Sequence, residues 1–361
     1  MAAMRAARFA LASACLLAAA ALLSGCGGGG DGGDSTAAAK PAPSRPAPAG
    51  DEFPKPFGRS LEELVKMADA HSELVVTPAA QVFYPGGNRY PFGVAERKGP
   101  PVSDAEVAIY YARVPQPKAG ARAKLGNKGL AGRAQAQALE EEAIGPFPAK
   151  IETLETKPAF EARTTVDDPD VARVVYSAQV PFPENGEWRM AALIREGDEL
   201  TATLLPSAHV GEYSAVPRPG EPAPLIHTPT AEEVGGDLSK ITTRVPPDTL
   251  NKVDYAEALG KEPILLLFAT PQFCQSRVCG PVVDVAQQAQ QEYGNEAAFI
   301  HMEIYNENDP GQGVRPQVRR FHLPSEPWLF AVNRKGVVSS AIEGAFGLEL
   351  MDEVAEKVIA E

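Results

Sequence analysis

The sequence predicts an α+β multidomain protein in which an all-β sandwich precedes an α/β layer domain. Within residues 51–215, short runs rich in β-branched and aromatic residues alternate with turn signals, as they do in all-β sandwiches. From residue 236 to residue 361, buried apolar runs alternate with amphipathic helical patterns, which is typical of an α/β layer. Residues 216–235 are rich in proline and are predicted to form a linker between the two domains.

The N-terminus has the pattern of an export signal. Arg5 and Arg8 form a basic start, residues 9–23 are an apolar run too short to span a bilayer comfortably, and small residues precede Cys26. The L-S-G-C stretch that ends there resembles the lipobox of bacterial lipoproteins. This resemblance implies that residues 1–26 are a lipoprotein signal and that Cys26 is acylated. The protein would then be lipid-anchored to a bacterial membrane outside the cytoplasm, at the cell surface or the periplasmic face. An uncleaved membrane anchor is the alternative.

Charge and composition narrow the classes of partner. The formal net charge is −13, and an acidic surface disfavours nucleic acid, whose phosphates require patches of Lys and Arg. Residues 27–50 are rich in Gly and Ser and then in Pro and Ala, which predicts a flexible stalk. We therefore expect no nucleic-acid partner, and a membrane attachment that depends on the lipid.

The predicted β domain begins with a short helix, for which Ser60 is the N-cap and Glu63 completes a capping box. Residues 117–148 are expected to be a helical or mobile insertion, and 85–88 and 183–186 have the composition of hairpin turns. The predicted strands are 80–84, 90–96, 106–113, 172–181, 188–195 and 200–205. The stretch 185–194 is similar to a late strand of immunoglobulin-like domains, which implies an immunoglobulin-like sandwich.

The predicted α/β domain begins with the end of a helix, at residues 255–259, and a buried strand at 263–269. A helix with a polar, Gln-rich face follows at 281–293. The remaining predictions are strands at 297–305, 328–332 and 336–342 and a closing amphipathic helix at 348–359.

A cysteine pair lies at the centre of this domain. Cys274 and Cys279 follow the strand at 263–269, Gly280-Pro281 leads into the helix, and Pro327 directly precedes the strand at 328–332. In this order of elements, residues 250–361 resemble a thioredoxin fold. The resemblance implies a thiol-disulfide oxidoreductase that exchanges disulfides with client protein thiols, without a cofactor or a metal site. It also implies that Pro327 is cis and faces the dithiol.

The spacing of the pair, C-x4-C, differs from the C-x-x-C of that family. In one regular helix, five residues rise by about 7.5 Å, and cysteines whose Cα atoms are more than about 7 Å apart cannot be bridged without backbone movement. A disulfide therefore requires Cys274 to lie outside the helix. Pro281 suits the first helical position, with Gly280 as the cap, so we expect Cys279 just before the helix.

The identity of the attacking cysteine is open. Phe273-Cys274 aligns with the family's aromatic residue and first cysteine, whereas Cys279-Gly280-Pro281 aligns with its C-G-P. A helix N-terminus, with Arg277 close by, would favour a thiolate. We favour Cys274 as the nucleophile and Cys279 as the resolving partner. The apolar Leu267-Phe268 replaces the buried acid that this family often carries before its first cysteine.

Two other classes of function also fit, so enzyme activity itself is undecided. The first is a non-catalytic extracytoplasmic binding or scaffold lipoprotein, in which the cysteines are a structural staple or unpaired. The second is a copper-delivery or thiol-peroxidase protein. Two thiolates and an imidazole can hold copper, and His301 and His322 are the histidines that follow the cysteines. The peroxidase pattern places a threonine three residues before its cysteine, where this chain has Pro271.

Overall fold

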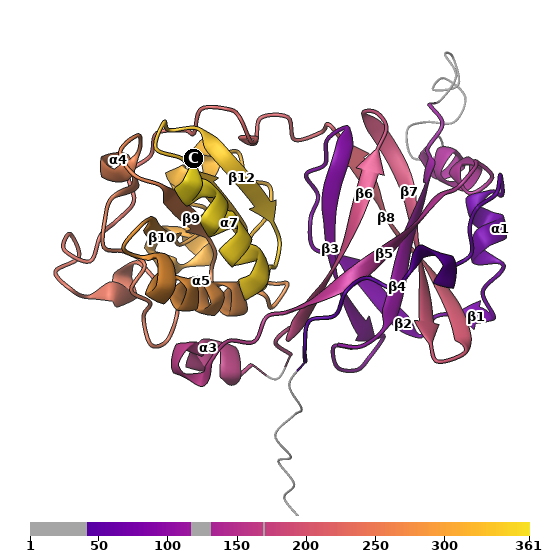
Figure 1. Ribbon diagram of the computed structural model, residues 1–361, viewed down its shortest axis with the longest axis horizontal. Coiled ribbons are helices and arrows are strands. Elements are labelled where there is room, and N and C mark those ends of the chain that lie inside the picture. The colour runs from indigo at the N-terminus through magenta and orange to yellow at the C-terminus, as the bar shows by residue number, and fades with distance from the viewer. Residues whose placement is uncertain (1–41, 117–130, 169) are drawn as a thin grey trace, which may run out of the picture. The chain divides into compact units, whose positions relative to one another are not determined.

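The computed structural model describes residues 42–116, 131–168 and 170–361 (Figure 1). Pro41–Glu361 form one compact unit that combines helices and strands, so the predicted α+β class is confirmed. The predicted signal with Cys26, and the first part of the predicted stalk, lie outside the described residues. Within the described ranges, no helix is long and apolar enough to cross a membrane.

Eight strands form one large sheet around a single core. They are β1 (Ala70–His71), β2 (Leu74–Pro78), β3 (Gly86–Glu96), β4 (Glu106–Arg113), β5 (Ile144–Thr153), β6 (Val174–Phe182), β7 (Gly186–Glu196) and β8 (Glu199–Val210). Their order is β1-β8-β7-β4-β5-β6-β3-β2, and the β1–β8 pair is parallel. Residues of β2, β3 and β6 pack in the same cluster as residues of β4, β7 and β8, so the sheet curls around this core.

The almost continuous apolar sequence of β4 is explained by burial on both of its faces. Val107, Ile109 and Tyr111 point into the core of the curled sheet, because side chains alternate along a strand. The intervening Ala108 and Tyr110 pack on the other face, against the helix α1 (Leu61–Val65). The predicted capping box of α1 is confirmed, since Ser60 and Glu63 each accept the other's backbone N–H.

Two predictions for this half of the chain are wrong. Residues 80–84 do not form a strand. In that segment, Phe83 makes an isolated bridge to Val210, while the N–H groups of Gln81 and Val82 donate to the carboxylate of Glu343. The hairpin turn predicted at 85–88 is consequently absent, because β3 already begins at Gly86. The turn predicted at 183–186 does connect β6 and β7.

The second error concerns the last part of the insertion predicted at 117–148; residues 131–138 are helical, as expected. Residues 117–130 lie outside the described part, but Ile144–Thr153 form β5, which pairs with β4 in its first half and with β6 in its second half. Proline cannot donate to a sheet ladder, so Pro146 and Pro148 conceal this strand in the sequence. The strand is compatible with both prolines because it changes partners along its length.

A second sheet has four strands, β9 (Ile264–Phe268), β10 (Ala298–Met302), β11 (Trp328–Val332) and β12 (Val338–Glu343), in the order β10-β9-β11-β12. The β9–β10 pair is parallel, and β11 is antiparallel to both β9 and β12. The helices associated with it are α4 (Tyr255–Ala258), α5 (Cys279–Tyr293), α6 (Pro316–Arg320) and α7 (Leu348–Ala360). Apart from α6, which the sequence does not predict, these elements agree with the predicted ones to within a few residues at each end.

All five residues of β9 are buried because helices cover both faces of this sheet. Leu265 and Leu267 pack in one cluster with α5 and α7. Ile264, Leu266 and Phe268 pack in another cluster, with residues of α4 and α6. The remaining short elements are η1 (Gly50–Glu52), η2 (Pro158–Phe160), α3 (Arg163–Val166), η3 (Leu238–Lys240), η4 (Asn306–Asn308) and η5 (Pro310–Gln312).

Two proline-rich segments lie along strands. In the predicted linker 216–235, the N–H of Gly220 donates to the carbonyl of Val338, and that of Ala223 donates to the carbonyl of Gly336. The linker therefore follows the edge of β12. In the described part of the predicted stalk, Arg45 exchanges two backbone hydrogen bonds with Ile151 of β5.

Candidate functional site

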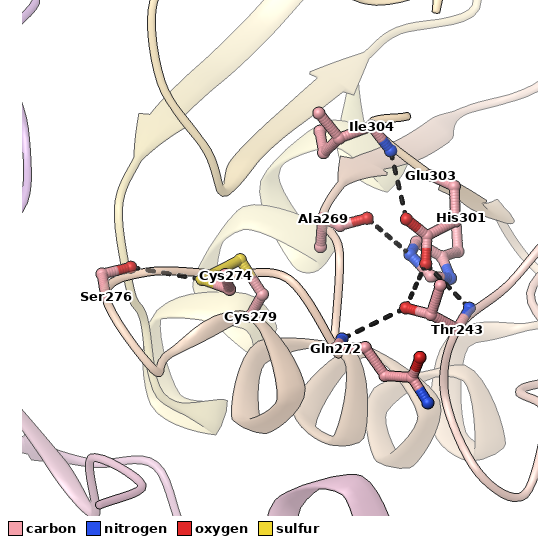
Figure 2. Close-up of a disulfide and its surroundings, with 9 residues drawn as sticks. All are labelled: Thr243, Ala269, Gln272, Cys274, Ser276, Cys279, His301, Glu303 and Ile304. Carbon is pink, nitrogen blue, oxygen red and sulfur yellow. Dashed lines mark hydrogen bonds between the residues drawn. A yellow bond between two sulfur atoms is a disulfide. The ribbon is translucent and has the colours of Figure 1, made fainter. Parts of the chain in front are cut away.

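The two cysteines of the C-x4-C motif form a disulfide, with their Cα atoms 5.8 Å apart (Figure 2). Cys274 lies in the loop after β9, outside the helix, as this bond requires. The predicted helix start is wrong by two residues, because α5 begins at Cys279 and Val278 occupies the N-cap position. Pro281 is tolerated in this first turn, where the N–H groups have no intrahelical acceptor.

The disulfide is asymmetric in its access to solvent. Cys279 is 0% exposed and Cys274 is 7% exposed. Cys274 also lines a surface recess of about 340 Å³. The Oγ atom of Ser276 lies 3.2 Å from the Sγ atom of Cys274. A reagent that arrives from solvent therefore meets Cys274 before Cys279.

The position of Cys279 favours its thiolate. It is the first residue of α5, which has 15 residues, so its sulfur lies at the positive end of the helix dipole. Arg277 adds less to this stabilisation of the Cys279 thiolate than the sequence suggests, because its charge is paired with a carboxylate. Its Nη1 atom donates to the carboxylate of Asp168 at 2.7 Å, and its side chain is 52% exposed.

Buried polar side chains fix the loop that carries Cys274. The N–H of Gln272, two residues before this cysteine, donates to the Oγ1 atom of Thr243 at 3.2 Å. The same hydroxyl donates to the buried carboxylate of Glu303 at 2.5 Å, and the Thr243 N–H donates to this carboxylate at 2.7 Å. Figure 2 shows this chain of contacts leading from Glu303 to the cysteine loop.

His301 holds the start of the same loop. This residue of β10 is fully buried, with Nδ1 2.9 Å from the Oδ2 atom of Asp248 and Nε2 3.1 Å from the carbonyl oxygen of Ala269. Because both neighbours are acceptors, both ring nitrogens donate and the ring is an imidazolium. Burial lowers the pKa of His301, but the charge and hydrogen bond of Asp248, together with Glu303 and the carbonyl of Ala269, raise it overall. Burial likewise opposes ionisation of Asp248, and His301 nevertheless holds the pKa of Asp248 at about 2.

A buried ion pair joins α5 to Arg244, and both of its members also bond to the segment that leads into α3. The Nε atom of Arg244 donates to the Oδ1 atom of Asp284 at 2.8 Å, and both side chains are almost completely buried. Arg244 also donates to the carbonyl of Phe160, and the Ala162 N–H donates to Asp284 at 3.1 Å. Burial raises the pKa of Asp284 in spite of the nearby Arg244.

Sequence patterns do not identify most of these polar residues. Thr243, Asp248 and Glu303 lie in or beside irregular segments, and their partners are distant in the chain. His301 interrupts an apolar strand, which is the one local signal of the network.

Pro327 is buried, and the peptide bond between Glu326 and Pro327 is cis. The preceding Ser325 and Glu326 line the same cavity as Gln275 and Ser276 from the cysteine loop, so this turn and that loop are neighbours. Ser325 also donates from its Oγ atom to the carboxylate of Glu343.

In the part of the chain that the structure describes, the two histidines considered as copper ligands do not form a metal site with the cysteines. Both ring nitrogens of His301 are already engaged, and His322 is an exposed residue after α6. Within residues 42–116, 131–168 and 170–361, no group of three or more His, Cys, Asp or Glu is arranged to hold a metal ion.

No protein-family model matches this chain, and no curated protein matches it. Among solved structures, the chain is similar to a DUF4784 family protein from Bacteroides caccae, with 13% sequence identity and a TM-score of 0.19. The match covers 39% of this chain and 24% of that one, and a TM-score this low supports no argument about fold or function.

Proposed function

We propose that this protein is a thiol-disulfide oxidoreductase-like protein, anchored outside the cytoplasm by a lipid on Cys26. In this proposal, the C-terminal part has a thioredoxin-like fold and the N-terminal part an immunoglobulin-like sandwich. The positions of the cysteines after β9 and of Pro327 directly before β11 support the first assignment. The curled and mostly antiparallel sheet supports the second assignment.

The observation that carries the proposal is the asymmetry of the disulfide. Exchange requires one sulfur that an external thiolate can reach and a second sulfur that can leave as a thiolate. Cys274 lines a surface recess, whereas Cys279 is buried at the N-terminus of α5. In the oxidised protein, an external thiolate attacks Cys274 and Cys279 leaves. In the reduced protein, Cys274 is the nucleophile and Cys279 resolves the mixed disulfide.

The proposal is tested by the reduction potential of the pair. The full-length chain, purified in mild detergent, is equilibrated in glutathione redox buffers and alkylated, and its thiols are counted by mass spectrometry. We expect one disulfide to titrate well above roughly −300 mV, below which structural disulfides lie. A disulfide that stays oxidised in every buffer, or cysteines that never pair, would reject exchange.

A non-catalytic scaffold is the second candidate, and the packing of residues 79–82 favours it. The Gln81 and Val82 N–H groups donate to Glu343, at the end of β12, at 3.1 and 2.8 Å. Part of the surface beside Ser325 is therefore already occupied by the chain itself. In a scaffold, Cys274–Cys279 would be a structural staple, and the titration above would find it resistant to reduction.

A further inference from the structure

The recess beside Cys274 is small and has two different walls. One wall is formed by the cysteine loop and the start of α5, including Pro271 and Gly280. The other is formed by Thr164, Asp167, Asp168 and Val171. The volume of about 340 Å³ lies at the low end of the range of small-molecule sites, roughly 300–1,000 Å³.

The outer wall is tied to the elements that carry the disulfide. At one end, the Ala162 N–H donates to Asp284 of α5 at 3.1 Å. At the other end, the Ala172 N–H donates to the carbonyl of Arg277 at 3.3 Å, and Arg277 pairs with Asp168 at 2.7 Å. The wall is therefore held in place at both ends, and it limits how closely a large molecule can approach the sulfur.

We propose that the exchange partner of Cys274 is a low-molecular-weight thiol, or its disulfide, in place of the protein clients that the thioredoxin resemblance implies. This inference rests on the proposed exchange function. A cysteine in a polypeptide brings flanking backbone on both sides, which needs more room than a recess of about 340 Å³ provides. A small thiol brings only a few atoms beyond its sulfur, and these fit inside the recess.

The proposed exchange needs no oxidant other than the Cys274–Cys279 disulfide itself. The thiolate RS⁻ attacks the Cys274 Sγ atom, the Cys274–Cys279 bond breaks, and its electron pair leaves on Cys279. A second RS⁻ then attacks the sulfur of the bound thiol in the mixed disulfide, which releases RSSR and the Cys274 thiolate. Overall, two thiols are oxidised to one disulfide and the protein disulfide is reduced to a dithiol. The reverse sequence oxidises the protein.

The charges around the recess favour a cationic thiol. Asp167 and Asp168 contribute two carboxylates, and Arg277 contributes one guanidinium that is already paired with Asp168. The remaining negative charge attracts an ammonium group and repels a carboxylate. Because Asp167 and Arg277 are solvent-exposed, the preference is a few-fold and falls with salt.

The test measures how fast thiols of different size react with the oxidised full-length chain. Rate constants, expressed per thiolate, are measured by stopped-flow for cysteamine, 3-mercaptopropionate and reduced unfolded ribonuclease A. We expect cysteamine to react about a hundredfold faster than the protein thiols, because access controls thiol reactivity. We also expect cysteamine to react faster than 3-mercaptopropionate at low salt. Protein thiols that react as fast as cysteamine would overturn the inference while leaving the exchange function intact.

Two matched substitutions locate the effect in the recess. Val171→Trp fills the recess and should lower the rate constant for the reaction with cysteamine by about tenfold or more. Val166→Trp is the control, because Val166 belongs to α3 but is 61% exposed and does not line the recess. Equal rates for the two variants would overturn the inference.

The charge-reversal variant Asp167→Lys provides a test that does not depend on filling the recess, since Asp167 is exposed. It should reverse the order of cysteamine and 3-mercaptopropionate, and an unchanged order would contradict the assigned site. A disulfide that reacts with none of the thiols would instead reject the proposed function itself, so the two failures are distinguishable.

Discussion

The Nε2 atom of His301 lies 3.1 Å from the carbonyl oxygen of Ala269, the residue that follows β9 and starts the loop to Cys274. The opposite ring nitrogen contacts Asp248, so a buried imidazolium connects this carboxylate to the first peptide group of the cysteine loop. With the contact between Gln272 and Thr243, the loop is fixed at two points before it reaches the disulfide.

The substitution Asp248→Asn should destabilise the protein at pH 7. It removes the negative partner of a fully buried imidazolium, and the loss of one member of a buried ion pair costs about 3–5 kcal/mol. Urea denaturation followed by fluorescence measures the change in the free energy of unfolding. Asp237→Asn, at an exposed site, is the control and should leave that free energy nearly unchanged. A cost below about 1 kcal/mol for Asp248→Asn would contradict a charged pair.

The same carboxylate should make stability depend on pH in the acid range. The folded-state pKa of Asp248 is about 2, below its ordinary value of 3.8. Its contribution is therefore present above the ordinary value and is lost as the pH falls toward 2. The unfolding midpoint of the wild-type protein should fall more steeply between about pH 4 and 2 than that of Asp248→Asn. Parallel pH profiles would rule out this assignment.

Thr243→Val should loosen the cysteine loop. The substitution preserves the shape of the side chain but removes the hydroxyl that accepts from Gln272 and donates to Glu303. We expect a loss of about 1–3 kcal/mol in the free energy of unfolding, because a buried carboxylate loses a donor. We also expect faster hydrogen exchange at the Gln272 amide. Thr243→Ser retains the hydroxyl and should restore protection, and a serine variant that behaves like valine would refute the role of this hydroxyl.

Single-cysteine variants should differ in their rates of alkylation. In Cys279→Ala the remaining Cys274 lines the recess, whereas in Cys274→Ala the remaining Cys279 is buried. Iodoacetamide should therefore modify the first variant about tenfold faster or more, since access limits the reaction. Both variants should react equally in urea, which is the control. Equal rates for the folded proteins would contradict the asymmetry of the site.

Gly344→Ala should be more destabilising than Gly313→Ala. Both glycines have a positive φ, of 80° and 72°, so alanine is strained at either position by about 1 kcal/mol. At Gly344, however, the added Cβ would lie 2.5 Å from the carbonyl oxygen of Ala79, whereas nothing lies within 4 Å at Gly313. Thermal unfolding of the two variants compares these costs. Equal shifts in Tm would mean that Ala79 does not pack against Gly344.

The sequence predicts well those elements whose pattern is repeated locally. The strands at β4 and β11 have the predicted bounds, because uninterrupted apolar runs between turn signals specify them. The capping box at Ser60 and Glu63 is also a local pattern. Such features depend on residues that lie next to one another in the chain.

The errors arise where distant contacts override local preference. β5 contains two prolines but is stabilised by strands on both sides. Residues 80–84 do not pair as a strand, because the N–H groups of Gln81 and Val82 donate instead to the carboxylate of Glu343, more than 250 residues away. The network around His301 joins β10 to the segment at 242–248, for which the sequence predicts no element. The start of α5 at Cys279 also depends on its surroundings, because Val278 offers no capping side chain.

The path of the linker has a practical consequence for dividing this chain into fragments. Gly220 and Ala223 donate along the outer edge of β12, and Val216 and Ile226 are buried against the same half of the molecule. A fragment beginning at residue 236 would expose that edge, which is a template for aggregation, together with the apolar surface beneath it. A soluble C-terminal fragment should therefore begin before Val216, so that it retains the proline-rich segment that covers the edge of β12.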